Sequence, residues 1–267
     1  MQEKLESGDK LIGAREGSVA TITFNNPAKH NAVSLDMWEA MDGLLAAYES
    51  DPDVRVLVVT GAGGKAFVSG ADISKFESER ATREAVAQYN RTAQGAYERL
   101  YRFPKPTIAK IRGYCIGGGV NLAACCDLRY CTQGSRFAIP AARLGLGYGY
   151  AGLKKLVEII GVSRALEMFY TARQFSSEEA FQMGLVNGVA ADDALDGFID
   201  ELTQRISANA PLTIATIKRA AREISRDPDE RDLAAVEAMV QACFESEDYV
   251  EGRRAFMEKR KPAFKGR

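Results

Sequence analysis

Two glycine-rich segments place small residues at a junction between a strand-like run and a helix-like run. Ser69-Gly70-Ala71-Asp72-Ile73 follows the apolar residues 66–68, and Gly117-Gly118-Gly119 lies between the apolar residues 108–111 and a helical run that starts at Val120. The first N–H groups of a helix have no partner inside it. Two such donors converging on one oxygen stabilise an enolate or a tetrahedral oxyanion, and the helix dipole favours the same charge. Either segment alone is typical of a tight turn, so the hypothesis needs both.

The flanks of these two segments resemble the enoyl-CoA hydratase/isomerase, or crotonase, superfamily. The resemblance covers residues 65–73 and 104–129, and it continues through residues 137–140, 144–146, 180–186 and 256–264. It therefore extends over nearly the whole chain. It implies an α/β fold, a spiral of ββα units followed by a C-terminal helical region. It also implies an acyl-CoA thioester as substrate, with no separate cofactor because coenzyme A is part of that substrate.

The same resemblance assigns roles to individual residues. It implies that the N–H groups of Ala71 and Gly118 form an oxyanion hole, and that the loop containing Lys29 contacts coenzyme A. It also implies that the basic tail reaches the coenzyme A site, often that of a neighbouring subunit. The remaining residues expected at the substrate are Ser69, Gly70, Asp72, Ile73, Gly117, Phe264 and Lys265.

Simpler roles stay open for several of these residues. Ser69 suits turn chemistry, and Asp72 suits the cap of a following helix. His30 is expected to be exposed and to contribute little to the chemistry. The basic tail is typical of a solvated face.

The chain departs from the family pattern where the hydratases carry two glutamates. Asn121 follows the Gly-Gly-Gly segment by two residues, and Ala141 follows the proline of the block Phe137-Ala138-Ile139-Pro140. An amide does not accept a proton at neutral pH and a methyl group has no acid–base chemistry, whereas activation of water needs a titratable group. Between Gly113 and Leu153 the only carboxylate is Asp127, which the sequence places at a structural position. The sequence thus argues against hydration by two glutamates.

Decarboxylation of a malonyl-type thioester needs the oxyanion hole but no base, because loss of CO2 itself generates the enolate. Tyr148 occupies the position where the similar methylmalonyl-CoA decarboxylases carry an active-site tyrosine, and its phenol is a candidate donor to the carboxylate or the enolate. Arg143 is a candidate partner of the same carboxylate, and Asn121 a candidate catalytic residue. A pocket wall for Tyr148, an ion-paired surface position for Arg143 and a loop contact for Asn121 stay open.

Three functional hypotheses follow. The first is an acyl-CoA lyase, a malonyl-type-CoA decarboxylase. The second is an enoyl-CoA hydratase or isomerase that takes an acid or base from elsewhere; the nearest carboxylates after Asp72 are Glu77, Glu79 and Glu84. The third is a catalytically silent acyl-CoA binder.

Bulk properties agree with a cytoplasmic enzyme. The chain carries 35 basic and 36 acidic residues, so no global field favours nucleic acid or an anionic membrane. Its first residues, 1–6, are charged and include no apolar segment, which argues against secretion, and no apolar run reaches the roughly 20 residues that span a bilayer. The five cysteines fit no zinc pattern and are expected to be buried free thiols; His30, the only histidine, does not build a metal site.

Hydrophobic periodicity predicts the elements that position these residues. We expect strands at residues 19–24 and 55–60, a helix capped by Ser34, and a longer helix from about residue 84 to 102. Residues 1–205 are expected to form the spiral core and residues 206–267 a helical trimerisation region. Apolar stripes in that region, from Thr213 to Ile224 and from Leu233 to Cys243, are expected to be core. The family resemblance implies a homotrimer, or a hexamer of two trimers, and the extent of these stripes agrees with such an assembly.

Overall fold

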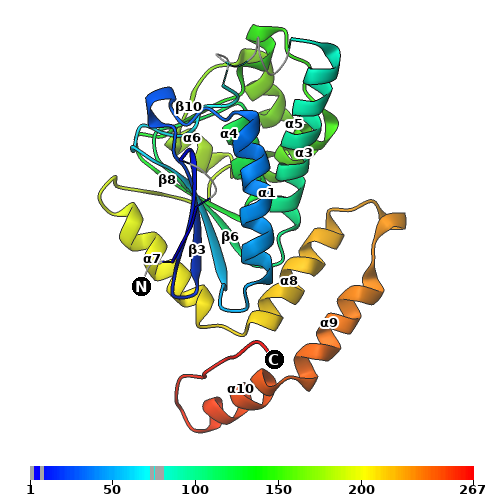
Figure 1. Ribbon diagram of the computed structural model, residues 1–267. Helices are drawn as coiled ribbons and strands as arrows, with labels where there is room; N and C mark the ends of the chain where they lie inside the picture. Colours follow the sequence, from blue (N-terminus) through cyan, green and yellow to red (C-terminus); the bar gives the residue numbers. More distant parts are fainter. Residues whose placement is uncertain (1–2, 7–8, 73–74, 76–80) are drawn as a thin grey trace.

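The computed structural model describes residues 3–6, 9–72, 75 and 81–267, and its strands form two sheets (Figure 1). The larger sheet has the order β1-β2-β3-β4-β6-β8-β11, in which β1, β2 and β3 are antiparallel and the later neighbours are parallel. The smaller sheet has the order β10-β9-β7-β5. The strands of the larger sheet are β1 (Glu3–Glu6), β2 (Leu11–Glu16), β3 (Val19–Phe24), β4 (Val56–Gly61), β6 (Thr107–Ile111), β8 (Leu128–Thr132) and β11 (Gly188–Ala190). Those of the smaller sheet are β5 (Ala66–Val68), β7 (Tyr114–Ile116), β9 (Arg136–Ala138) and β10 (Phe175–Ser176).

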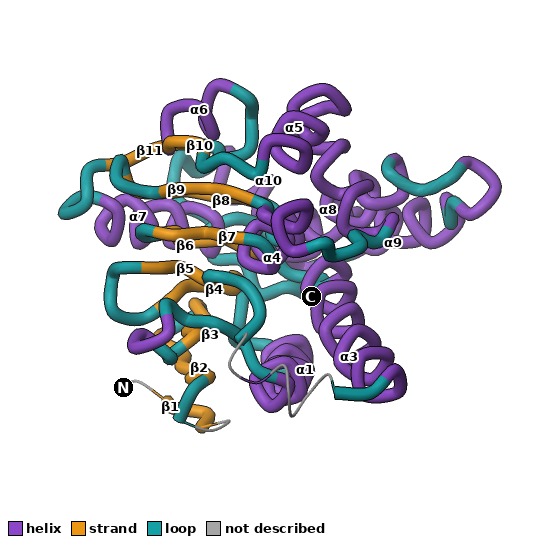
Figure 2. The backbone as a smooth tube through the Cα atoms, turned by 90° about the horizontal axis from the view of Figure 1, so that it is seen from above, coloured by secondary structure: helices purple, strands orange, loops and turns teal. Residues whose placement is uncertain are grey.

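Successive turns of the chain give one strand to each sheet and then a helix. Strands β4 and β5 precede α3 (Arg83–Arg102), β6 and β7 precede α4 (Gly118–Cys125), and β8 and β9 precede α5 (Tyr150–Thr171). The predicted spiral of ββα units is confirmed. Figure 2 shows the resulting stack of strands, with α1, α3, α4 and α5 gathered on one side.

The sequence pattern locates the elements around the site closely. Helix α1 (Leu35–Ser50) begins directly after Ser34, and α3 starts one residue before the predicted range. Both helices bury the apolar side chains that recur at helical spacing, and they pack against each other. On the other face of the larger sheet, Val56, Val58 and Ile108 pack against α7 (Leu195–Ser207). The remaining short helices are η1 (Pro27–Lys29), η3 (Pro140–Leu144), α6 (Ser177–Gln182) and η4 (Pro228–Glu230).

The C-terminal region consists of α8 (Pro211–Ile224), α9 (Leu233–Glu245) and α10 (Glu247–Met257), which extend away from the spiral (Figure 1). The expectation that their apolar stripes are core is wrong for this chain alone: Ile217, Ile224 and Leu233 are 63%, 73% and 64% exposed. Helix α9 buries none of its residues. The cause is geometric, because α9 and α10 reach beyond the body that could cover them. The predicted division at residues 205/206 falls inside the last turn of α7 and stays a prediction.

Four of the five cysteines are buried and all five are free, as expected, with Cys243 half-buried. No helix among the described residues is long and apolar enough to cross a membrane.

Candidate functional site

The first glycine-rich segment runs beside residues 30–33 as a short parallel bridge. Val33 donates its N–H to Gly70 O at 2.9 Å, and Asp72 donates its N–H to Val33 O at 2.9 Å. Ala71, paired with Val33 across this bridge, points its own N–H the other way, as alternation along an extended chain requires. That N–H has no hydrogen bond among the described residues.

The second segment turns sharply into α4. Gly117 has φ +56°, a conformation that favours glycine, and its N–H donates to Ala138 O at 2.7 Å. Helix α4 begins at Gly118, so the Gly118 N–H has no acceptor inside the helix. No other partner for it is present among the described residues.

The two segments touch each other. A Cβ placed on Gly70 would lie 3.7 Å from Gly118 N, and a Cβ on Gly118 would lie 3.6 Å from Gly70 Cα. Gly119 permits this approach, because a Cβ there would lie 2.1 Å from Val68 O. The structure therefore brings Ala71 and Gly118 to one cavity. That their N–H groups share a single oxygen stays a prediction.

The cavity has a volume of about 700 Å³, within the usual range for small-molecule sites. Of the predicted residues, it is lined by Ser69, Gly70, Ala71, Gly117, Gly118, Asn121, Ala141 and Tyr148. No aspartate or glutamate of the described chain lines it, and Arg91 is its one described charged side chain. Sequence reasoning missed the contribution of α3, which supplies Tyr89, Asn90, Arg91, Ala93, Gln94 and Tyr97.

Tyr97 and Asn121 form a polar chain behind the hole. The Tyr97 hydroxyl donates to Gly118 O at 3.2 Å. Burial raises the pKa of Tyr97 well above its usual value, while a hydrogen bond from the Asn121 side chain acts in the opposite direction. The Asn121 side chain of α4 thus lies beside Tyr97 of α3. Asn121 Oδ1 is buried without a partner in the described chain. The predicted loop contact for Asn121 is thus an inter-helix contact, with one acceptor unused.

Tyr148 lies near the end of the loop that joins η3 to α5. Its ring packs edge-on against Phe169 at 4.6 Å between centroids, and Gly152 leaves it room, since a Cβ there would lie 2.9 Å from Tyr148 Cε1. Burial is the main cause that raises the pKa of Tyr148 well above its usual value, with a smaller contribution from Cys125. The phenol is therefore neutral near pH 7, so it can donate a hydrogen bond but does not act as a base.

Lys29 and Asp72, also predicted near the hole, do not line the cavity. Lys29 Nζ forms an ion pair with Asp72 at 3.0 Å, and this pair joins η1 to the first segment beside the buried Asp72 carboxylate. Ser69 Oγ contacts Lys29 O at 3.4 Å, in keeping with a turn role. His30 is exposed, as expected, and stacks edge-on against Tyr114. Ile73 and the helix that Asp72 was expected to cap lie outside the described residues.

Arg143 and the tail lie elsewhere. Arg143 is exposed on η3 and does not line the cavity. Phe264 lies against Gly252 of α10, and the Lys265 N–H donates to Asp248 Oδ1 at 2.7 Å. The C-terminus thus lies beside α9 and α10 (Figure 1). Within one chain, the structure does not bring the tail to the cavity.

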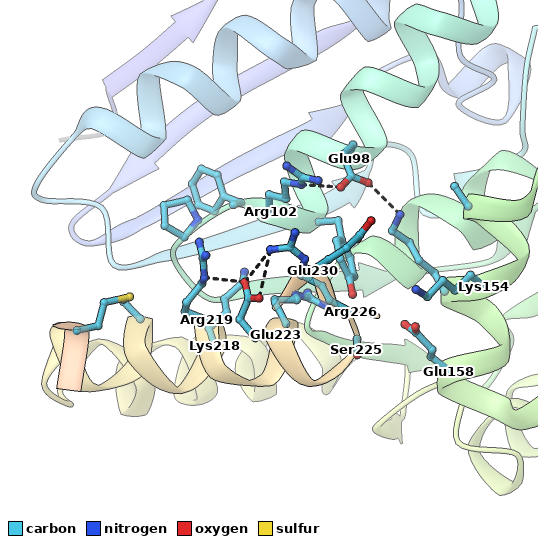
Figure 3. Close-up of a pocket in the computed structure, with 18 of the residues that line it drawn as sticks. Glu98, Arg102, Lys154, Glu158, Lys218, Arg219, Glu223, Ser225, Arg226 and Glu230 are labelled. Carbon is cyan, nitrogen blue, oxygen red and sulfur yellow. Dashed lines mark hydrogen bonds and ion pairs between the residues drawn. The ribbon is translucent and has the colours of Figure 1, made fainter. Parts of the chain in front are cut away.

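A second cavity, of about 470 Å³, lies between α3, α5 and α8 (Figure 3). Two of its carboxylates form ion pairs across or along the lining: Glu98 pairs with Arg102 and Lys155, and Glu223 pairs with Arg219 and Arg226. Beside it, Asp127 accepts hydrogen bonds from Lys218 and Arg222 of α8, each at 2.7 Å. Asp127 also accepts from the Thr107 N–H at 2.8 Å. These contacts attach α8 to the spiral, so the structural interpretation of Asp127 is confirmed.

Residues 14–267 match the family model described as enoyl-CoA hydratase/isomerase. A short-chain-enoyl-CoA hydratase of Clostridium acetobutylicum is 34% identical over 97% of this chain and 99% of its own length. A carnitinyl-CoA dehydratase of Escherichia coli O157:H7 is also 34% identical, over 97% of this chain and 99% of its own. A solved enoyl-CoA hydratase/carnithine racemase from Magnetospirillum magneticum superposes with a TM-score of 0.91, at 34% identity and 97% coverage of both chains. The chain belongs to the enoyl-CoA hydratase/isomerase family.

Proposed function

We propose that the protein binds an acyl-CoA thioester and stabilises the enolate formed from it. The observation that carries this proposal is that the N–H groups of Ala71 and Gly118 lie beside one cavity and have no partner among the described residues. Preorganised backbone donors of this kind act on charge that develops at the thioester oxygen. The dipole of α4, whose N-terminus faces the same point, adds to the effect.

Within this chemistry, hydration, dehydration or isomerisation of an enoyl-CoA is the reaction that the comparisons favour. Relatives that are 34% identical over nearly the whole chain are named hydratase and dehydratase. Asn121 supports the same choice: its free Oδ1 accepts a hydrogen bond from water or a hydroxyl group, but it repels a carboxylate. The acid or base then comes from outside positions 121 and 141. Glu84 is exposed on α3 and does not line the cavity, while Glu77 and Glu79 lie outside the described residues.

Decarboxylation of a malonyl-type thioester is the second candidate. The observation in its favour is that no described carboxylate lines the cavity, so none would repel the substrate's own carboxylate. The neutral Tyr148 phenol is a donor suited to protonating the enolate.

Assays of the purified protein with crotonyl-CoA and methylmalonyl-CoA test both candidates. We expect slow hydration of crotonyl-CoA, because each missing acid–base group is worth on the order of 10²–10⁴-fold. Release of CO2 from methylmalonyl-CoA without hydration would replace the first candidate with the second. Binding of both thioesters without turnover of either would instead leave the silent acyl-CoA binder.

A further inference from the structure

Arg91 brings to the cavity a positive charge that no carboxylate of the described residues compensates. It is exposed on α3 and, among the described residues, is the only charged side chain in the lining. Its guanidinium donates to Gln88 Oε1 at 2.9 Å, a neutral partner. It takes part in none of the ion pairs of the described chain, and the positions three and four residues away on the helix hold no acid.

Two other arginines of α3, Arg99 and Arg102, form ion pairs with carboxylates. Arg99 pairs with Asp42 at 3.3 Å and with Glu49 at 3.2 Å, and Arg102 pairs with Glu98 at 2.6 Å. Arg91 differs from them in lining the cavity beside the hole and in forming no ion pair with a described residue. An unpaired guanidinium in that place suits an anionic ligand group, because its planar fork matches a carboxylate or a phosphate.

The position of Arg91 along α3 tells which part of a ligand it can reach. Tyr97, six residues later, contacts Gly118 at the hole. Six residues correspond to about 9 Å along a helix axis, so Arg91 lies well away from the thioester carbonyl. The amides of Asn90 and Gln94, which also line the cavity, flank it with further donors. These groups suit the far end of an acyl chain better than a substituent next to the thioester.

We propose that Arg91 recognises a carboxylate at the distal end of the acyl chain, so that the preferred substrate is a CoA thioester of a dicarboxylic acid. The inference rests on the proposed function, since it assumes that the thioester lies at the hole. The sequence suggested Arg143 as the partner of a malonyl-type carboxylate. In this proposal the arginine that binds a substrate carboxylate is instead Arg91, at the distal end of the acyl chain. A chain that ends in a quaternary ammonium group would be repelled.

Equilibrium binding separates the two sources of an anion, the acyl carboxylate and the phosphates of coenzyme A. The probes are adipoyl-CoA, hexanoyl-CoA and free CoA, measured by calorimetry on the full chain. The two thioesters have equal length and differ only at the terminal group. We expect the wild type to bind adipoyl-CoA about fivefold to tenfold more tightly than hexanoyl-CoA. Arg91→Gln should bring this ratio to about one while the affinities for hexanoyl-CoA and free CoA stay unchanged.

Two further variants control for nonspecific effects. Arg91→Lys should keep part of the preference, because it keeps the charge and loses the planar fork. Arg83→Gln, an exposed arginine of the same helix outside the cavity lining, should keep all of it. A wild-type ratio of one or less overturns the inference, as does an equal loss of free CoA affinity in Arg91→Gln, which would assign Arg91 to a phosphate. Failure of all three ligands to bind would overturn the proposed function itself.

Discussion

Asn121 shows how one substitution changes the chemistry that a cavity can perform. Its Oδ1 is buried and has no partner in the described chain, so the side chain can accept a hydrogen bond and orient its donor but cannot remove a proton. Ala141, which also lines the cavity, adds no polar group. The reaction therefore depends on groups other than these two.

The first prediction restores the missing carboxylates. Asn121→Glu combined with Ala141→Glu should raise crotonyl-CoA hydration by at least tenfold, because general acid–base catalysis is then available beside the hole. Initial rates at saturating substrate measure the effect. Asn90→Glu, which adds a carboxylate to the lining on α3, is the control and should give no such gain. An unchanged rate in the double variant would show that the cavity does not place water between the two positions.

The second prediction concerns the Tyr148 phenol. Tyr148→Phe should lower kcat severalfold with little change in KM, since the hydroxyl acts on a reacting group rather than in binding coenzyme A. Because burial raises the Tyr148 pKa well above its usual value, the phenol stays protonated through neutral and mildly alkaline pH. The wild-type rate should therefore show no alkaline decline from Tyr148 below pH about 10. Tyr150→Phe, a neighbouring tyrosine outside this cavity, is the control; an equal loss there would refute a specific role for Tyr148.

At the scale of elements, local pattern located the scaffold better than the site. Strand β3 matches its predicted range, and α3 begins one residue before its own predicted start. Both were predictable because the spacing of apolar residues indicates which face of a strand or helix is buried. The glycines of the two hole segments could also be found, since strand-to-helix junctions carry a recognisable composition. Arg91 and Tyr97 could not, because helical spacing places them on α3 without saying which element lies opposite. Arg143, the candidate partner of a malonyl-type carboxylate, is exposed and does not line the cavity, because nearness in sequence to Tyr148 does not fix the direction of a side chain.

The third prediction tests the hole through its glycine. Gly118→Val should abolish thioester turnover, because even its Cβ would lie 2.8 Å from the Tyr97 hydroxyl and would displace the hole or the tyrosine. Thermal unfolding should show only a modest loss, since the Gly118 position is only half-buried. Gly95→Ala on α3, where a Cβ meets nothing within 4 Å, is the control. It should keep full activity and gain stability of about 0.5–1 kcal/mol. Wild-type turnover in Gly118→Val would contradict the assignment of the hole.

The fourth prediction concerns the attachment of the tail to α10. A hydrogen bond from Arg260, together with one from the Ala263 N–H, lowers the pKa of Glu251 to about 2. A lowered carboxyl pKa stabilises the attached tail at pH values above the ordinary 4.5, and this contribution is lost as the pH falls from there towards 2. Hydrogen exchange in residues 260–266, corrected for the intrinsic effect of pH, should rise over that range. Glu251→Gln should cause the same rise at pH 7, whereas Glu258→Gln, which contacts Arg260 only at its Nε, should have a smaller effect.

At the scale of the whole molecule, the C-terminal helices leave apolar surface uncovered. Phe256 and Met257 are 82% and 80% exposed at the end of α10, and α9 buries none of its residues. A cavity of about 670 Å³ between α8, α9, α10 and Phe264 is lined mainly by apolar side chains. Contiguous apolar surface of this kind marks an interaction site. The C-terminal tail carries Phe264 and Lys265, which were expected at a coenzyme A site. Within one chain these two residues lie beside α10 and do not line the cavity.

The fifth prediction is that the chain assembles as a homotrimer, or as a hexamer of two trimers, through α8, α9 and α10. Sedimentation at micromolar concentration should give three or six times the chain mass of 29.1 kDa. Phe256→Asp with Met257→Asp should shift the protein towards monomer, because charge at the centre of an apolar contact is costly to bury. Tyr170→Asp, a change at a similarly exposed position on α5, is the control for the trimer.

If the tail completes a neighbour's site, the dissociated variant should also bind free CoA more weakly than the wild type. A stable wild-type monomer would refute the assembly, and undiminished CoA affinity in the dissociated variant would separate the tail from the site.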